Sequence, residues 1–228
     1  KQKLKGIYLM DPVFNVDRDR AKEICRFIIR HNKKNIPFHT EIKAELVDEE
    51  MAELFHKANM KYLEIGLQSS KRRVLHGVNR KLDIKKFVRG VNLLKNYDMR
   101  SEVQLILGLP GDTLGSFKRS LEFVLRLDPP ALATFRLQVL PGTEIRRKVK
   151  MLGMVHEKAP PYYLLHSRGF PLKKMREAQK IINSLNLFRR KVAIRYLCVE
   201  TRTKLLDLMS VWIDWLKDDE FLLKPKKN

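Results

Sequence analysis

Carboxylates and a glycine-containing turn in the first two thirds of the chain are the residues best suited to bind a small polar ligand. Asp11, Glu45 and Glu64 could form a set of acceptors for a cationic group. The segment Leu107–Thr113 (LGLPGDT) follows an apolar run, and glycines there let a backbone approach a ligand at a helix N-terminus. The segment lacks GxGxxG and the Lys-Ser/Thr of a P-loop, so a plain strand-to-helix turn is the alternative interpretation.

Nucleophiles and metal ligands are sparse. The chain has two cysteines, Cys25 and Cys198, which exclude a disulfide scaffold and a self-contained cysteine-rich metal site. Both lie in periodic apolar segments, where a cysteine is a small core residue more often than a nucleophile. The histidines show no metal-ligand spacing, and no GxSxG or Cys/His pairing is visible. The residues alone therefore identify neither a metal site nor a catalytic residue.

Short apolar runs alternate with amphipathic helical patterns. Residues typical of helix N-caps stand at Asn15 or Asp17, at Asp48, at Asp83 and at Thr113 or Ser116. Strand–helix alternation at this spacing predicts parallel strands joined by right-handed crossovers. We expect five such strands, near residues 6–11, 38–45, 61–67, 102–108 and 132–140.

The alternation fits either an open doubly wound sheet or part of a (β/α) barrel. In both folds ligands bind at the carboxyl ends of the strands, and every expected strand here ends in a polar or Gly-Pro element. We expect one domain over residues 1–145 and a mainly helical region over 146–228. That second region carries an amphipathic helix from Lys173, an ambiguous apolar run at 192–199 and an apolar helix at 203–216.

The chain is strongly basic. Its 228 residues contain 47 Lys and Arg against 26 Asp and Glu, a net charge of +21. Such a field attracts nucleic acid, but the basic residues are not interleaved with aromatics as in a base-stacking groove, which favours a lysine-rich surface. No apolar run reaches the roughly 20 residues of a membrane span, and no secretory signal opens the chain. We expect a reduced, cytoplasmic setting.

An ordered set of motifs resembles the radical SAM superfamily. It comprises Tyr62–Ser69 (YLEIGLQS), Asn79-Arg80, Val103–Gly111 (VQLILGLPG) and Leu137–Thr143 (LQVLPGT). Their blend is similar to the branch with cobalamin-binding radical SAM proteins and oxygen-independent coproporphyrinogen oxidases, as is Met10–Asn15 (MDPVFN). The resemblance implies an α/β fold, a partial TIM-like (β/α)6 barrel that keeps strands 2 to 6 of the radical SAM core.

The resemblance also implies how S-adenosylmethionine (SAM) would bind. Asp11 and Glu45 match groups at the methionine amino end, Arg80 matches an arginine that holds the carboxylate, and Gln68 matches a glutamine on the ribose. Gln104 stands where that branch has a ribose-contacting aspartate, and this departure leaves its role open. The adenine would lie near Gly108 and the backbone of Val139.

One departure concerns the iron–sulfur cluster. The family's Cys-x3-Cys-x2-Cys motif, which binds a [4Fe–4S] cluster, does not occur in this sequence. The economical interpretation is that the first strand, the cluster loop and any cobalamin domain lie N-terminal to this sequence. A natural cluster-free homologue is the alternative, and then the chain would be a scaffold.

The resemblance implies an enzyme, either an oxidoreductase or a methyltransferase. The parent would cleave SAM to a 5′-deoxyadenosyl radical and act on a substrate that the sequence does not identify, a small molecule being the default. A basic nucleic-acid-binding α/β module is the competing function. This chain alone is expected to be inactive.

Overall fold

The computed structural model describes residues 4–97 and 99–189. The chain divides into two compact units between Gln138 and Val139. This division lies earlier in the chain than the boundary after residue 145 that the sequence pattern suggested. The expected segments at 192–199 and 203–216, together with Cys198, lie outside the described residues.

A single five-stranded sheet forms the centre of the first unit. Its strands are β1 (Ile7–Leu9), β2 (Phe38–Ile42), β3 (Met60–Gln68), β4 (Arg100–Leu107) and β5 (Ala131–Arg136), in the order β1-β2-β3-β4-β5. Every neighbouring pair is parallel. The expected parallel, sequentially ordered α/β architecture is therefore confirmed, as an open sheet whose edges in the described chain are β1 and β5.

Helices connect these strands in the way the capping residues predicted. The connecting elements are α1 (Arg18–His31), the 3₁₀ helix η1 (Ala44–Leu46), α2 (Glu49–Lys57), α3 (Arg72–His76), α4 (Ile84–Asn96) and α5 (Leu114–Leu127). The side chains of Asp17, Asp48, Asp83 and Thr113 each accept a backbone N–H in the first turn of their helix. These caps satisfy donors that a helix start leaves unpaired.

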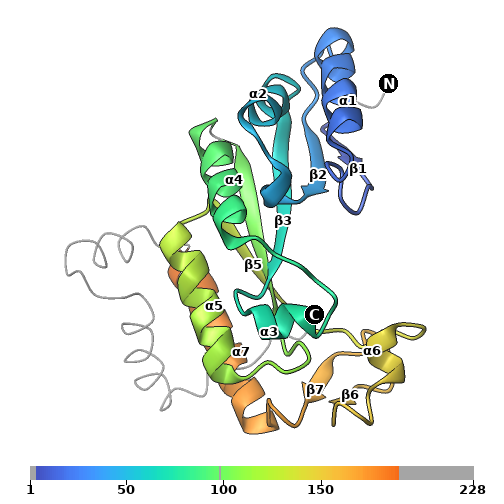
Figure 1. Ribbon diagram of the computed structural model, residues 1–228, viewed down its shortest axis with the longest axis vertical. Coiled ribbons are helices and arrows are strands. Elements are labelled where there is room, and N and C mark those ends of the chain that lie inside the picture. The colour runs from blue at the N-terminus through green and yellow to red at the C-terminus, as the bar shows by residue number, and fades with distance from the viewer. Residues whose placement is uncertain (1–3, 98, 190–228) are drawn as a thin grey trace, which may run out of the picture. The chain divides into compact units, whose positions relative to one another are not determined.

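The two faces of the sheet differ in chemistry. Alternate residues of β3 and β4, such as Ile65 and Val103, are fully buried, on the face where α2, α4 and α5 pack (Figure 1). Most of the intervening residues are polar and partly exposed, including Glu64 and Gln104. Because strand side chains alternate between faces, the sheet has one apolar helix-covered face and one polar open face.

The second unit contains a strand pair that the sequence pattern did not predict. The unit consists of helix α6 (Glu144–Arg147), the antiparallel strands β6 (Val155–His156) and β7 (Leu164–His166), which form the pair, and helix α7 (Leu172–Arg189). Helix α7 confirms the amphipathic helix expected from Lys173, and its apolar residues, such as Met175 and Leu185, are buried. In the described part of the chain, no helix combines the length and hydropathy of a membrane-spanning segment.

Candidate functional site

Glu45 lies just beyond the sheet, in the turn that follows β2. Strand β2 ends at Ile42, and Glu45 lies in η1 rather than at the end of the strand as we expected. The expectation was wrong because alternation continues through FHTEIKAE, whereas the chain turns at Lys43. There the backbone N–H and carbonyl of Lys43 are held by the amide of buried Asn15, at 2.8 and 2.9 Å. The turn carries Glu45 into a position where its side chain is only 10% exposed.

Arg80 folds back from the loop after α3 toward the end of β3. The preceding residue, Asn79, has a left-handed φ of 53°, and the Arg80 N–H donates to the Leu75 carbonyl at 2.9 Å. The guanidinium Nη2 donates to the carbonyl of Gly66 and lies 3.8 Å from Oε1 of Glu45. Burial lowers the pKa of Arg80, and Glu45 opposes that shift. Arg80 is therefore directed toward the end of β3 and toward Glu45.

Gln68 ends β3 in an unusual backbone conformation. Its φ is 67°, a left-handed value that costs free energy for a residue other than glycine. The strand pairing with β4 shifts register between Gly66 and Gln68, and the Gln68 amide lies directly over Gly66, where a Cβ would collide with it. The absence of a side chain at Gly66 therefore makes room for the amide of Gln68.

These three side chains share an unusual property. In the described part of the chain, four buried side-chain nitrogen or oxygen atoms have no hydrogen-bond partner: Oε2 of Glu45, Oε1 of Gln68, Nε of Arg80 and Oγ of Ser101. Buried polar atoms are normally paired, and an unpaired one costs about 1–3 kcal/mol, more when charged. Three of the four atoms belong to residues that the resemblance assigned to SAM. These residues are a carboxylate, an amide and a guanidinium, and each has one polar atom that can still form a hydrogen bond with a ligand.

Asp11 has a different environment. Its carboxylate accepts from Nη1 of Arg20 in α1 at 2.9 Å, and its side chain is 27% exposed. No hydrogen bond or ion pair joins Asp11 to Glu45, Gln68 or Arg80 among the described residues. The two side chains lie at an open surface hollow beside β1, together with Leu9, Met10, Pro12, Phe14 and Ile24.

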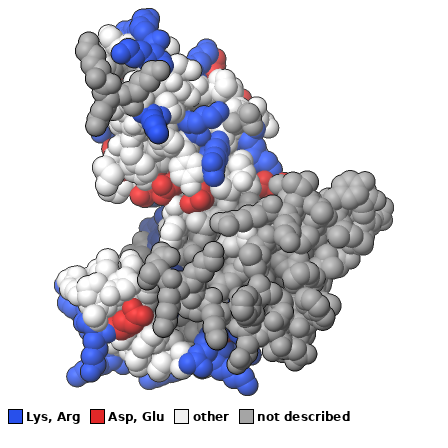
Figure 2. Space-filling model, turned by 180° about the vertical axis from the view of Figure 1, so that it is seen from behind, with Lys and Arg blue, Asp and Glu red and all other residues white. Residues whose placement is uncertain are grey.

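Gln104 lies in a hydrogen-bonded group on the open face. Its Nε2 donates to Oε2 of Glu64 at 2.8 Å and to Oε1 of Glu102 at 3.3 Å, while the Tyr8 hydroxyl donates to Oε1 of Glu64 at 3.1 Å. Burial and this bond to Glu64 raise the pKa of Tyr8 to about 12. Figure 2, which views the molecule from behind, shows acidic side chains gathered in the first unit. Gln104 in β4 is the cross-strand partner of Gly66 in β3. The carbonyl of this same glycine accepts the hydrogen bond from Arg80.

Two predicted adenine-side positions are backbone positions. Gly108 follows β4 with a φ of 91°, which glycine adopts without strain. Val139 lies in the second unit, where its N–H donates to the Tyr162 carbonyl at 2.9 Å and its carbonyl accepts from Arg146 at 3.2 Å. The adenine contacts of Gly108 and Val139 therefore stay predictions.

Sequence reasoning missed the residues that support this arrangement. Gly90 of α4 is buried, and a Cβ there would collide with the carbonyl of Ala44 in η1. This close approach of α4 to η1 fixes the turn that carries Glu45. The signal was a glycine in the middle of a strongly amphipathic helix pattern, which usually has a packing reason.

Within residues 4–97 and 99–189, no side chains are suited to bind an iron–sulfur cluster. Burial raises the pKa of Cys25 to about 12, whereas a metal-binding cysteine must be a thiolate. Among the described residues, no group of three or more Cys, His, Asp or Glu side chains could hold a metal ion. The described residues therefore do not fit an iron–sulfur cluster.

The fold is a parallel α/β domain, and comparison with known proteins identifies its family. Residues 1–124, more than half of the chain, match the family model described as the Radical SAM superfamily. The chain belongs to this superfamily, whose members use SAM and a [4Fe–4S] cluster.

Two relatives illustrate its range. The chain is 33% identical over 111 residues to the threonylcarbamoyladenosine tRNA methylthiotransferase MtaB of Thermotoga maritima, covering 46% of this chain and 25% of that protein. It is 26% identical over 127 residues to the oxygen-independent coproporphyrinogen III oxidase of Helicobacter pylori, covering 55% and 28%.

Among solved structures, the radical SAM methyltransferase TsrM of Kitasatospora setae, with cobalamin and a [4Fe–4S] cluster bound, has a TM-score of 0.57 at 20% identity, covering 68% and 33%. That likeness shows the fold. The chain thus spans about a quarter to a third of the length of these proteins.

Proposed function

We propose that this chain is the SAM-binding part of a radical SAM enzyme and that it holds SAM through Glu45, Gln68 and Arg80. The observation that carries the proposal is that each of these three side chains has one buried polar atom without a hydrogen-bond partner. A buried polar atom that has no partner destabilises the fold until a ligand satisfies it.

The chemistry of SAM matches each unpaired atom. Arg80 offers N–H donors to the methionine carboxylate, and such charge-assisted bonds are about twice as strong as neutral ones. Glu45 offers an acceptor to the methionine ammonium, and Gln68 offers a carbonyl oxygen to the ribose hydroxyls. The 3.8 Å separation of Arg80 from Glu45 is longer than a hydrogen bond, so neither charge is fully used by the other.

The remaining predicted contacts have less support. Asp11 already accepts from Arg20 through Oδ2, and Gln104 already donates to Glu64 and Glu102. The Gln104 carbonyl oxygen is still free to accept from a hydroxyl, in keeping with a ribose role. We propose that the turn at Gly108 lies near the adenine; the backbone N–H and carbonyl of Val139 are already bonded to Tyr162 and Arg146.

SAM supplies a 5′-deoxyadenosyl radical when a reduced cluster donates an electron to it. The described residues do not fit that cluster, so we propose that its ligands come from outside this chain. The contribution of this chain is to orient SAM by its carboxylate, ammonium and ribose. Cobalamin stays a prediction for another domain of the parent protein. This chain alone, after anaerobic iron–sulfur reconstitution, is expected to leave SAM uncleaved.

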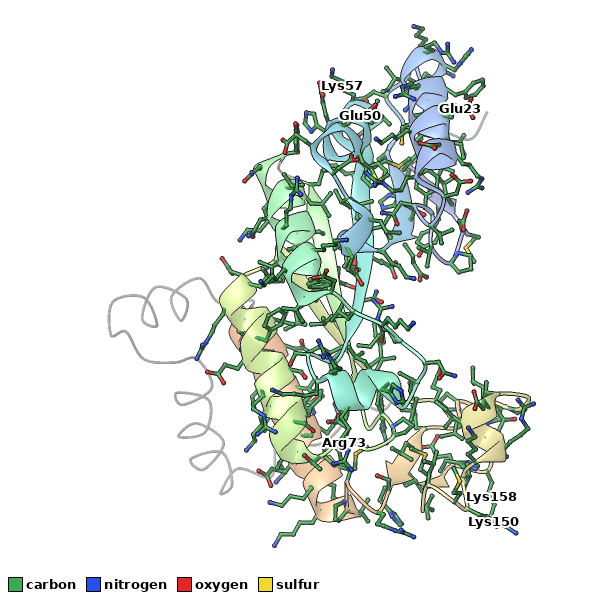
Figure 3. All side chains as sticks on the ribbon, viewed as in Figure 1. Glu23, Glu50, Lys57, Arg73, Lys150 and Lys158 are labelled. Atoms are coloured by element: carbon green, nitrogen blue, oxygen red, sulfur yellow. The ribbon has the colours of Figure 1, made fainter. Side chains whose placement is uncertain are left out.

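RNA is a second candidate partner, favoured by the charge of the second unit. Residues 139–186 contain ten Lys and Arg against three Asp and Glu. Lys150 and Lys158 are exposed and extend outward from this unit (Figure 3). The name of the Thermotoga relative refers to tRNA. Tight RNA binding that weakens steeply with salt would favour an RNA substrate, and weak binding would favour a small molecule.

Titration calorimetry with SAM tests the proposed site. The chain should bind SAM, and Glu45→Gln, which keeps the side-chain volume and removes the charge, should weaken binding about 10- to 100-fold, as expected for a hydrogen bond to a charged group. Glu23→Gln is the control, because Glu23 is exposed on α1 (Figure 3). Equal affinities for the two variants, or no binding by the unaltered chain, would contradict the proposal.

A further inference from the structure

A network of buried hydroxyl groups joins the loop after β3 to helix α5. At its centre is Ser120 of α5, which is 1% exposed. Its Oγ accepts from the Ser70 N–H at 3.0 Å and lies 3.1 Å from Oγ of Ser70 and 3.3 Å from Oγ of Ser69. Oγ of Ser69 in turn accepts from the Lys71 N–H at 3.1 Å. One helical hydroxyl therefore anchors the loop that directly follows Gln68.

The same network continues to the turn after β4. The Ser120 hydroxyl donates to the Ser116 carbonyl at 3.1 Å, and the Ser116 hydroxyl contacts the carboxylate of Asp112. Asp112 is 2% exposed and ends the glycine-containing turn that starts at Gly108. Hydrogen bonds thus connect the two loops to which the resemblance assigned the ribose and adenine of SAM.

The conformation of Gln68 requires such an anchor. Its left-handed φ is unfavourable for a residue with a Cβ and persists only where surrounding contacts over-determine it. On one side, Gly66 leaves space for the Gln68 amide. On the other side, the Ser69 N–H donates to the Leu67 carbonyl at 2.8 Å across Gln68. Ser69 and Ser70 are both hydrogen-bonded to Ser120.

We infer that Ser120 is a positioning residue for SAM, which holds the Ser69–Ser70 backbone and thereby keeps the Gln68 amide directed at the ribose. This inference rests on the proposed function, because it concerns the same SAM site. Ser120 does not touch the ligand in this scheme, and its effect on binding passes through Gln68.

Hydrogen exchange tests the anchoring without any ligand. In Ser120→Ala, the amide protons of Ser70 and Lys71 should exchange faster than in the unaltered chain, because one loses its acceptor and the other depends on Ser69. Protection unchanged at both amides would overturn the inference. This measurement decides the anchoring even if the chain binds no SAM, an outcome that would contradict the proposed function instead.

A double-mutant cycle on SAM affinity tests the route through Gln68. Ser120→Ala and Gln68→Ala should each weaken SAM binding about 5- to 10-fold, the range for one lost hydrogen bond. The double variant should bind about as weakly as Gln68→Ala alone, because coupled residues are not additive. Additive losses, or a loss in Gln68→Ala with none in Ser120→Ala, would overturn the inference.

Two further variants separate positioning from general destabilisation. Ser101→Ala is the matched control, since Ser101 is a fully buried serine of β4 whose hydroxyl has no partner among the described residues; SAM affinity should not change. Ser120→Thr keeps the hydroxyl, which in a helix can still bond the carbonyl four residues earlier. It should recover SAM affinity to within about 2-fold even if the added methyl group lowers stability. A loss in Ser120→Thr as large as in Ser120→Ala would show that the hydroxyl is not responsible.

Discussion

Two acid–base pairs at the strand ends show opposite environments. Asp11 and Arg20 meet at 2.9 Å with side chains 27% and 51% exposed, so each charge has both a partner and water. Glu45 and Arg80 are less exposed, at 10% and 19%, but lie 3.8 Å apart, and each retains an unpaired buried atom. The Asp11–Arg20 pair has the better ion-pair geometry, yet it is the weaker candidate for a binding site, because its charged groups already have hydrogen-bond partners. Burial without a partner marks the ligand site.

Loss of Arg80 should produce the largest effect on ligand binding. We expect Arg80→Ala to weaken SAM binding by ~1.5–3 kcal/mol, the range for hydrogen bonds to charged groups, measured by calorimetry. Arg73→Ala is the control, because Arg73 is exposed on α3 of the same connection (Figure 3). A loss of similar size in both variants would attribute the effect to net charge and break the contrast between the two pairs.

A methyl group at Gly90 should displace the turn that carries Glu45 and so alter the Glu45–Arg80 pair. Alanine normally favours a helix over glycine by about 0.8–1.0 kcal/mol, but here its Cβ would collide with the Ala44 carbonyl. We expect Gly90→Ala to lower the free energy of unfolding by about 1–3 kcal/mol and to weaken SAM binding, because η1 carries Glu45.

The matched change in α5 has the opposite expectation. A Cβ at Gly115 has its nearest neighbour, Nη1 of Arg119, at 3.5 Å, so Gly115→Ala should stabilise the fold by about 0.5–1 kcal/mol. Urea unfolding followed by circular dichroism measures both variants. Equal stabilisation by both would show that α4 and η1 separate readily, contrary to the close approach described.

The exposed pair should matter little for stability. Arg20→Ala should change the free energy of unfolding by less than about 1 kcal/mol, as for other surface ion pairs, and should leave SAM affinity unchanged or higher, because it frees Asp11. Asp11→Asn should weaken SAM binding about 3- to 10-fold if its predicted contact with the ammonium forms. Unchanged SAM affinity in Asp11→Asn would remove Asp11 from the site and sharpen the contrast between the pairs.

The smallest effect concerns Tyr8 on the open face. Its pKa of about 12 in the folded chain exceeds the value near 10 of an unfolded tyrosine. The folded state therefore retains the proton longer, and this contribution to stability is complete below pH 10 and lost between pH 10 and 12. From pH 9 to 11, the unaltered chain should lose more stability in urea unfolding than Tyr8→Phe. An equal loss would mean that folding does not raise the pKa of Tyr8.

Local patterns were sufficient to predict the elements of the first unit. The capping carboxylates of Asp17, Asp48 and Asp83 bond within three residues, and the alternation along β3 and β4 separates apolar from polar positions within one strand. Such interactions depend on neighbours in sequence, so the parallel sheet and its order could be inferred from residue types and spacing. The short pair β6 and β7 was missed, because two or three residues are too few to show a period.

The site depended on contacts between distant residues, which only the folded chain decides. The sequence suggested Glu45, Gln68 and Arg80 through a family resemblance, but not that Glu45 would leave β2 at a turn held by Asn15, 28 residues from Lys43. Nor could the sequence show that the backbone of Ala44 packs closely against Gly90, or that Ser120 anchors Ser70, which is 50 residues away. The types of side chain are local information, whereas which polar atoms end up buried without partners depends on how α4 and α5 pack on the sheet.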